Sequence, residues 1–210
     1  MGNKSVKGST EYRDWSKSVK FSNEKGKRIK HKKFERDEQI EAFNMPSDCR
    51  VVELGARYGT VSCALSAHLD DPTQHIAVEA DAKVWRALDA NRESNQCQFQ
   101  QVNGVISDEP LCLKQSGYGS TTFQCDAADA IPNYTLGELG AENYTCLVAD
   151  CEGCTPSVLN SNPGFAANLK YVTIEMDGTK EQNAETREIF RRNGMKRDGT
   201  QDAFREVWRK

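Results

Sequence analysis

The sequence predicts an α/β fold in which a mostly parallel sheet is covered by helices on both faces. Three observations support this prediction. Short apolar runs that suit buried strands alternate with stretches of helical period, a turn with Gly55 and Gly59 follows the first run, and acidic residues end several runs. In sheets of this kind, ligands bind beyond the carboxyl ends of the strands. We therefore expect the functional site at that edge of the sheet.

The apolar runs place the strands in chain order. We expect strands at 51–54, 76–79, 98–102, 111–114, 145–149 and 171–174. The segment 116–122 is rich in Gly, Ser and Thr, which predicts a loop. Residues 195–208 are expected to form a closing antiparallel hairpin.

The stretches between the strands read as amphipathic helices. In the helix expected at 60–69, four apolar residues share one side: Val61, Ala64, Leu65 and Leu69. Helices are also expected at 82–93, 155–160 and 180–193. Strands joined by helices in this rhythm imply right-handed crossovers, so the sheet is predicted to be mostly parallel.

Charge divides the chain into two parts. Residues 1–36 hold 12 Lys and Arg against 4 Asp and Glu, a net charge of +8, whereas residues 37–210 have a net charge of −11. We predict a basic N-terminal arm, 1–36, and one acidic domain, 37–210. The favoured interpretation of the arm is a solvated tail. The alternative is an arm that contacts an anionic partner or a neighbouring domain.

The cysteine pattern is interpreted as that of a reduced protein. Most of the eight cysteines lie in apolar runs such as VSCAL and YTCLVAD, where a free thiol packs as a small hydrophobe. No signal peptide is visible, and no apolar run approaches the ~20 residues of a membrane span. We therefore expect free thiols in a cytoplasmic protein, and the Asn-x-Thr sequons at Asn133 and Asn143 carry no weight there.

The Cys151-x-x-Cys154 pair allows other interpretations. At a strand-to-helix junction such a pair can be redox-active, because a helix N-terminus lowers the pKa of a thiol. It can also form half of a zinc site, but no second pair with ligand spacing is present. Packing in the core is the expected role.

Five predicted site residues fall at carboxyl ends of expected strands: Glu53, Gly55, Glu79, Asp150 and Glu175. A dinucleotide site would need a second glycine where Arg57 stands, and no Gly-Lys-Ser/Thr of a P-loop exists. Acids at Glu53 and Glu79 suit a cofactor that has no phosphates and one cationic end. S-adenosylmethionine fits, because an acid near the first turn can hold its amino group and an acid ending the second strand can accept from both ribose hydroxyls.

Six segments carry a family resemblance: VVELGARYGTVSCAL, IAVEADAKVWRALDANRESN, QVNGVISDEP, YTLGEL, LVADCEGCTPSVL and YVTIEMD. Over residues 51–177 the chain resembles class I S-adenosylmethionine-dependent methyltransferases, and specifically the FkbM-type family. The Asp-x-Glu-Gly at 150–153 is the most specific piece. The resemblance implies a Rossmann-like fold with a seven-stranded sheet that ends in an antiparallel hairpin.

The resemblance also implies a set of cofactor residues. Glu53, Gly55 and Gly59 would line the methionine end, Glu79 with Ala80 the ribose, and Asn103, Gly104 and Val105 the adenine. Ala56, Arg57 and Tyr58 complete the first turn, and Asp150 closes the site. The family commonly has Asn where Arg57 stands and small apolar residues in place of Cys151 and Cys154, which leaves the contact of Arg57 open.

For the reaction, the resemblance implies O-methylation of a sugar or glycan hydroxyl, with glycosyltransferase domains or proteins as neighbours. The expected catalytic residues are Asp150, Glu152 and Glu175, because the histidines offer no obvious base. Asp150, Glu175 and Asp177 could alternatively hold Mg²⁺ or Mn²⁺ that lowers the pKa of the acceptor hydroxyl. Helix capping or a structural ion pair is the other interpretation of Glu152 and Asp177.

Two other classes of function fit the sequence less well. An RNA-modifying or nucleic-acid-binding protein would use the basic arm, but the domain itself is acidic, so nucleic acid is not the expected partner. A non-catalytic cofactor-binding module would need an acidic cluster that holds neither substrate nor metal.

Overall fold

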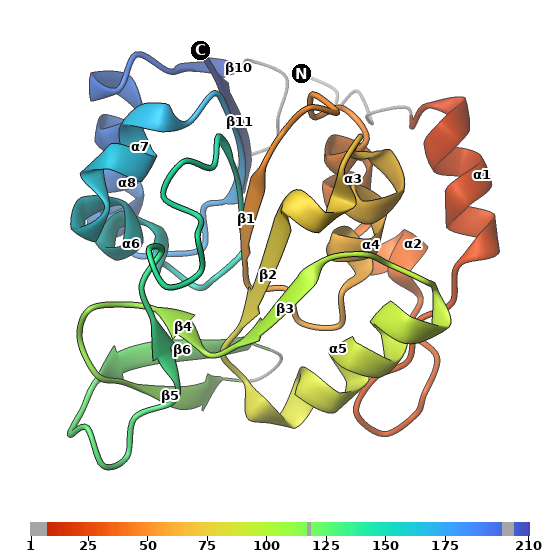
Figure 1. Cartoon of the computed structure of the whole chain (residues 1–210), viewed down its shortest axis with the longest axis horizontal. Helices are drawn as coiled ribbons and strands as arrows, with labels where there is room; N and C mark the ends of the chain where they lie inside the picture. Colours follow the sequence, from red (N-terminus) through yellow and green to blue (C-terminus); the bar gives the residue numbers. More distant parts are fainter. Residues whose placement is uncertain (1–7, 117–118, 199–203) are drawn as a thin grey trace.

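The computed structural model describes residues 8–116, 119–198 and 204–210, and a seven-stranded sheet forms its centre (Figure 1). Its strands are β1 (Val51–Leu54), β2 (His75–Glu79), β3 (Gln100–Asn103), β8 (Cys146–Ala149), β9 (Tyr171–Glu175), β10 (Lys196–Asp198) and β11 (Arg205–Arg209). The strand order is β10-β11-β9-β8-β1-β2-β3. The five strands from β9 to β3 pair in parallel, and β11 is antiparallel to both of its neighbours. The predicted fold class is confirmed, including the closing antiparallel pair.

Helices cover both faces of this sheet. They are α1 (Thr10–Ser18), α2 (His31–Phe34), α3 (Arg36–Ala42), α4 (Thr60–His68), α5 (Ala82–Ser94), α6 (Thr155–Ser161), α7 (Pro163–Asn168) and α8 (Lys180–Arg192), with a short 3-10 helix at Pro72–Gln74. One face packs on α6, α7 and α8, and the other on α3, α4 and α5 (Figure 1). Within β1, Val52 joins the first core and Val51 the second, as alternation along a strand requires. In the described part of the chain, none of the helices has the length and apolar character that crossing a bilayer requires.

The predicted loop at 116–122 is wrong where the structure describes it. Residues 119–124 form β6 (Gly119–Gln124), which pairs antiparallel with β5 (Leu111–Ser116). The Thr121-Thr122-Phe123 run has side chains that favour strands, and this preference outweighs the turn-forming residues around it. A second small sheet joins β4 (Val105–Ile106) to β7 (Asn133–Tyr134). Both small sheets lie beside the carboxyl ends of the main strands (Figure 1).

The N-terminal segment is not a solvated tail over the residues that the structure describes. Tyr12 and Phe21 are buried to 4% and 1% exposure in the cores beneath α4 and α5. The side chain of Asn91 on α5 bonds both the backbone N–H and the carbonyl of Ser22 at 2.9 Å. The prediction of a solvated tail relied on net charge and was wrong, because a few spaced aromatic residues anchor a segment that is otherwise polar.

The expectation of free thiols is wrong, because all eight cysteines are paired. The disulfides are Cys49–Cys146, Cys63–Cys97, Cys112–Cys125 and Cys151–Cys154. An apolar neighbourhood buries a disulfide as readily as a thiol, so sequence context did not distinguish the two. The expected cytoplasmic location depended on free thiols and loses that support, since disulfides persist mainly in oxidising compartments.

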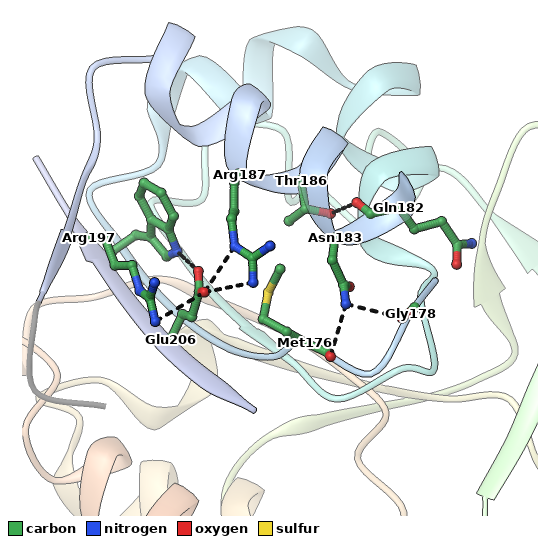
Figure 2. Close-up of polar contacts among 9 residues, drawn as sticks. Met176, Gly178, Gln182, Asn183, Thr186, Arg187, Arg197 and Glu206 are labelled. Carbon is green, nitrogen blue, oxygen red and sulfur yellow. Dashed lines mark hydrogen bonds and ion pairs between the residues drawn. The ribbon is translucent and has the colours of Figure 1, made fainter. Parts of the chain in front are cut away.

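The C-terminal strand is fixed to α8 by a buried ion pair (Figure 2). The carboxylate of Glu206 on β11 is fully buried and accepts from the Arg187 guanidinium at 2.9 and 3.0 Å. Arg197 on β10 lies 3.3 Å from the same oxygen. Two cations therefore compensate one buried acid, which holds β10, β11 and α8 together.

Candidate functional site

A cavity of about 1040 Å³ opens at the carboxyl ends of β1, β2, β8 and β9. This volume is at the upper end of the ~300–1,000 Å³ that is usual for small-molecule sites, so it has room for a cofactor and an acceptor. Twelve of the predicted site residues line it: Glu53, Gly55, Ala56, Arg57, Tyr58, Glu79, Ala80, Gly104, Val105, Asp150, Glu152 and Glu175. The fold therefore gathers residues that lie up to 122 positions apart in the sequence.

Three predicted site residues do not line this cavity. Gly59 is the N-cap of α4, and a Cβ there would lie 2.7 Å from the Leu88 side chain, so its lack of a side chain serves packing. Asn103 accepts a hydrogen bond from Gln101 at 2.7 Å and faces a separate hollow beside α5. Asp177 accepts hydrogen bonds from the backbone of the turn that follows β8.

The turn after β1 passes directly against the end of β8. Gly55 has a φ of 90°, and a Cβ at this position would lie 1.8 Å from the backbone oxygen of Asp150. The N–H groups of Gly55 and Ala56 both donate to the Val78 carbonyl at 3.0 Å. Arg57 adopts a φ of 47°, a conformation that costs a residue with a side chain about 1 kcal/mol. The close contact brings the turn after β1 and the Asp150 end of β8 together.

Glu79 is fixed in place at the end of β2. Its two carboxylate oxygens accept from the backbone N–H groups of Arg57 and Asp81, each at 2.7 Å. Burial raises the pKa of Glu79, and these two hydrogen bonds oppose that shift. Because a carboxylate can accept about four hydrogen bonds, two acceptor positions remain for a ligand in the cavity.

Glu53 is held by a residue of the neighbouring strand, β2. Its Oε2 lies 2.9 Å from Nε2 of His75, and both side chains are almost completely buried. His75 thus supports Glu53 from within the sheet.

The carboxyl group of Asp150 has a strongly raised pKa. Its side chain lines the cavity at the end of β8, and the residue is exposed there. Loss of hydration raises its pKa to about 9, and the nearby acids Glu175 and Asp177 add to the shift. This shift favours the protonated form of the Asp150 carboxyl, whose side chain forms a hydrogen bond with that of Asp177.

Asp177 ties two turns together. Its oxygens accept from the backbone N–H groups of Glu152 and Gly153 at 2.7 and 3.0 Å. The turn that carries Asp177 is clamped from α8, because Asn183 donates to the carbonyls of Met176 and Gly178 at 3.0 and 3.1 Å (Figure 2). Asp177 is thus a structural residue that joins two turns, but the N–H groups that it binds precede α6 and do not belong to the helix N-terminus.

The predicted metal ligands do not fit a metal site. Both oxygens of Asp177 are used by backbone N–H groups, and Glu175 lies 3.6 Å from the Arg205 guanidinium, which also pairs with Glu38. Across the described ranges, no three His, Cys, Asp or Glu side chains are grouped so that they could hold a metal ion. The metal prediction is therefore not supported, and no step below depends on one.

Sequence reasoning missed the N-terminal side of the cavity. Arg28, Lys30, Glu35 and Glu38 all line it. Burial raises the pKa of Glu38 to about 7, and it raises that of Glu35 as well. No local pattern in a Lys-rich segment distinguishes these residues from a solvated run. The Tyr58–Glu24 hydrogen bond, at 2.6 Å, links this segment to the first turn.

No protein-family model matches the sequence, and no curated protein matches it. The structure is similar to precorrin-6y C5,15-methyltransferase from Geobacter metallireducens, with a TM-score of 0.53 and 11% identity over 86% of this chain and 87% of that one. It is equally similar, at a TM-score of 0.53 and 12% identity, to a protein from Klebsiella pneumoniae provisionally assigned as an O-methyltransferase, over 97% and 90% of the two chains. The fold is the Rossmann-like methyltransferase fold.

A third structure with this fold contains the cofactor that the sequence predicts. It is a protein from Streptococcus pneumoniae, provisionally assigned as a tRNA (m1A22) methyltransferase, in complex with S-adenosyl-L-methionine. Its TM-score is 0.50, with 12% identity over 81% of this chain and 71% of that one. At these identities, the likeness establishes the methyltransferase fold and not the reaction.

The raised pKa of Asp150 predicts how stability depends on pH. The folded protein holds this proton up to about pH 9, whereas the unfolded chain releases it near the ordinary value of 3.8. The free energy of unfolding should therefore fall as pH rises between these values. Asp150→Asn should remove this slope and raise Tm at pH 8. Because cavity water screens the exposed carboxyl, we expect a gain of about 1 kcal/mol, or roughly 2–4 °C.

Thermal unfolding from pH 5 to 9 checks this prediction. Asp108→Asn serves as the control, because Asp108 is an exposed residue outside the cavity. An Asp150→Asn curve that runs parallel to wild type would contradict the assignment of the slope to Asp150.

Proposed function

We propose that this chain is an S-adenosylmethionine-dependent O-methyltransferase whose acceptor is a hydroxyl group of a sugar or glycan. The observation that carries the proposal is the composition of one cavity in a methyltransferase fold. Fixed carboxylates at Glu53 and Glu79 line its cofactor side, and a carboxyl of high proton affinity, Asp150, lines the other.

The cofactor half rests on Glu79 and the first turn. The two free acceptor positions of Glu79 match the paired hydroxyls of a ribose. Glu53, Gly55 and Ala56 would hold the methionine end, and the backbone at Gly104 and Val105 would flank the adenine. When bound, S-adenosylmethionine supplies a methyl group on a positively charged sulfonium, which is open to attack by an oxygen nucleophile.

The acceptor half rests on Asp150. A hydroxyl loses its proton when it is methylated, so a group that accepts this proton aids the reaction. A pKa of about 9 gives Asp150 the required proton affinity, and a cationic cofactor beside it would favour the ionised form that can act as base. The negative charge of Glu175 raises the proton affinity of Asp150, and Arg205 holds the Glu175 side chain in position. Glu152 reaches across the cavity to Gly119 of β6, where an acceptor would pass.

A sugar acceptor is supported by two features. The FkbM-type resemblance covers 51–177, including the Asp-x-Glu-Gly after β8. Phe123 of β6 lines the cavity and is 49% exposed, and Ser120 and Gln124 of the same strand line it as well. This mixture of one ring and several polar groups suits a molecule with C–H faces and many hydroxyls.

RNA is the second candidate acceptor. Arg28 and Lys30 line the cavity, and they belong to a segment whose net charge is +8. Phosphate groups of RNA would pair with such residues. The carboxylates deeper in the cavity weigh against this candidate, because they repel a phosphate backbone.

Methyl transfer to a panel of acceptors tests the proposal. The full chain is incubated with S-adenosylmethionine and either glycosides or RNA, and products are examined by mass spectrometry for the mass of one added CH₂. We expect a methylated glycoside hydroxyl. Asp150→Asn should still bind the cofactor by calorimetry but lose about 10²–10⁴-fold in turnover, whereas Asp108→Asn stays active. Methylated RNA without methylated glycoside would support the second candidate, and absence of cofactor binding would contradict both.

A further inference from the structure

The four disulfides bear on the compartment in which this chain folds. Three of them close loops that span 97, 34 and 13 residues. Cys49 and Cys146 are 6% and 0% exposed, and their bond joins the segment before β1 to the first residue of β8. This buried bond at the amino ends of β1 and β8 is structural, because reductants cannot reach it in the folded protein. Structural disulfides form mainly in secretory or other oxidising compartments.

In such a compartment the two Asn-x-Thr sequons become candidate sites of N-glycosylation. The structure places them in different environments. Asn143 lies in the turn before β8, and its side chain is exposed. The backbone around it is anchored, because Tyr144 is buried and the N–H of Thr145 donates to Arg50 at 3.0 Å. An exposed acceptor on an anchored surface turn is the setting in which an N-linked glycan is accommodated.

Asn133 is in a different position. It is half-buried in β7, and its Nδ2 donates to the carbonyl of Glu109. This nitrogen is the atom that would carry a sugar, so a glycan there would lie against Glu109 and crowd the strand that pairs with β4 beside the cavity.

The position of Asn143 also keeps a glycan clear of the cavity. Asn143 precedes β8, whereas Asp150 follows it, and the four residues of the strand separate the two by roughly 13 Å at ~3.3 Å per residue. A glycan at Asn143 would therefore extend from the edge of the sheet opposite the cavity.

We propose that this chain folds in an oxidising secretory compartment and carries an N-linked glycan on Asn143. In the modification, the amide nitrogen of Asn143 loses a proton and forms a bond to the anomeric carbon of a lipid-diphosphate-linked oligosaccharide, and the lipid diphosphate leaves. This proposal does not depend on the methyl acceptor.

The test uses the full chain purified from its own source with thiols blocked at lysis. We expect no alkylated cysteine before reduction. Peptide-N-glycosidase should lower the intact mass and convert Asn143 to Asp, a change that peptide mass spectrometry detects. Free thiols, or an unmodified Asn143 peptide, would overturn the proposal, and a glycan on Asn133 alone would overturn the site assignment.

Sequon variants expressed in the same host sharpen the test. Asn143→Gln and Thr145→Val should both lose the glycan, whereas Thr145→Ser and Asn133→Gln should keep it. Binding of S-adenosylmethionine by the glycosidase-treated protein should equal that of the untreated protein, because Asn143 lies at the far edge of the sheet. Loss of the mass shift in Asn133→Gln but not in Asn143→Gln would reverse the assignment.

Discussion

Glu79→Ala is expected to abolish measurable binding of S-adenosylmethionine while the chain stays folded. The variant removes the carboxylate that we assign to the ribose. It also leaves the N–H groups of Arg57 and Asp81 without their present acceptor, so the first turn loses one of its fixed points. Each hydrogen bond to a charged group contributes about 1.5–3 kcal/mol, so loss of two ribose contacts should weaken binding roughly 10²–10⁴-fold.

Isothermal calorimetry, with circular dichroism as the check on folding, measures this effect. Glu93→Ala is the matched control, because Glu93 is an exposed acid on α5, the helix that follows the same strand. Glu79→Gln should fall between wild type and alanine, since an amide keeps one acceptor oxygen. A folded Glu79→Ala protein with wild-type affinity would remove Glu79 from the cofactor site.

Gly55→Ala is expected to destabilise the whole domain by more than about 4 kcal/mol, a loss comparable with the total stability of many domains. The added Cβ would lie 1.8 Å from the backbone oxygen of Asp150 and 2.8 Å from its carbonyl carbon. These atoms cannot move aside without cost, because the N–H of Asp150 donates to Leu54 at 2.9 Å in the ladder between β1 and β8. Urea unfolding should show a large fall in the midpoint.

Gly140→Ala distinguishes the steric contact with Asp150 from the cost of a positive φ. Gly140 also has a positive φ, of 66°, but a Cβ there meets no atom within 4 Å. Only the backbone conformation is then penalised, at about 1 kcal/mol. Equal destabilisation by the two variants would show that backbone conformation, and not the contact with Asp150, makes glycine necessary at position 55.

Local patterns were enough to predict the centre of the fold. The expected strand at 51–54 is β1, the helices expected at 60–69 and 82–93 differ from α4 and α5 by one residue, and the closing strands are antiparallel. These predictions succeeded because a buried strand and an amphipathic helix each leave a period in the sequence. The boundary of β3 moved from 98–102 to Gln100–Asn103, as expected where the apolar run is weak.

The candidate site was predictable in part for the same reason. The carboxyl ends of parallel strands lie at the same edge of a sheet, so acids near these ends come close together. Their positions in the sequence therefore predict that Glu53, Glu79, Asp150 and Glu175 line one cavity. Which partner each acid has was not predictable. His75 beside Glu53 is one such partner, and it lies on a neighbouring strand.

What the sequence by itself determined is the order of strands and helices and the row of acids at the carboxyl edge, because these follow from the local period and from the parallel topology. Tertiary structure alone decided the four disulfides, the burial of Phe21 and the high pKa of Asp150. Each of these depends on groups that are distant in the chain: Cys49 meets Cys146 across 97 residues. Thiol oxidation and carboxyl ionisation respond to such neighbours in space, and neighbours in sequence do not reveal them.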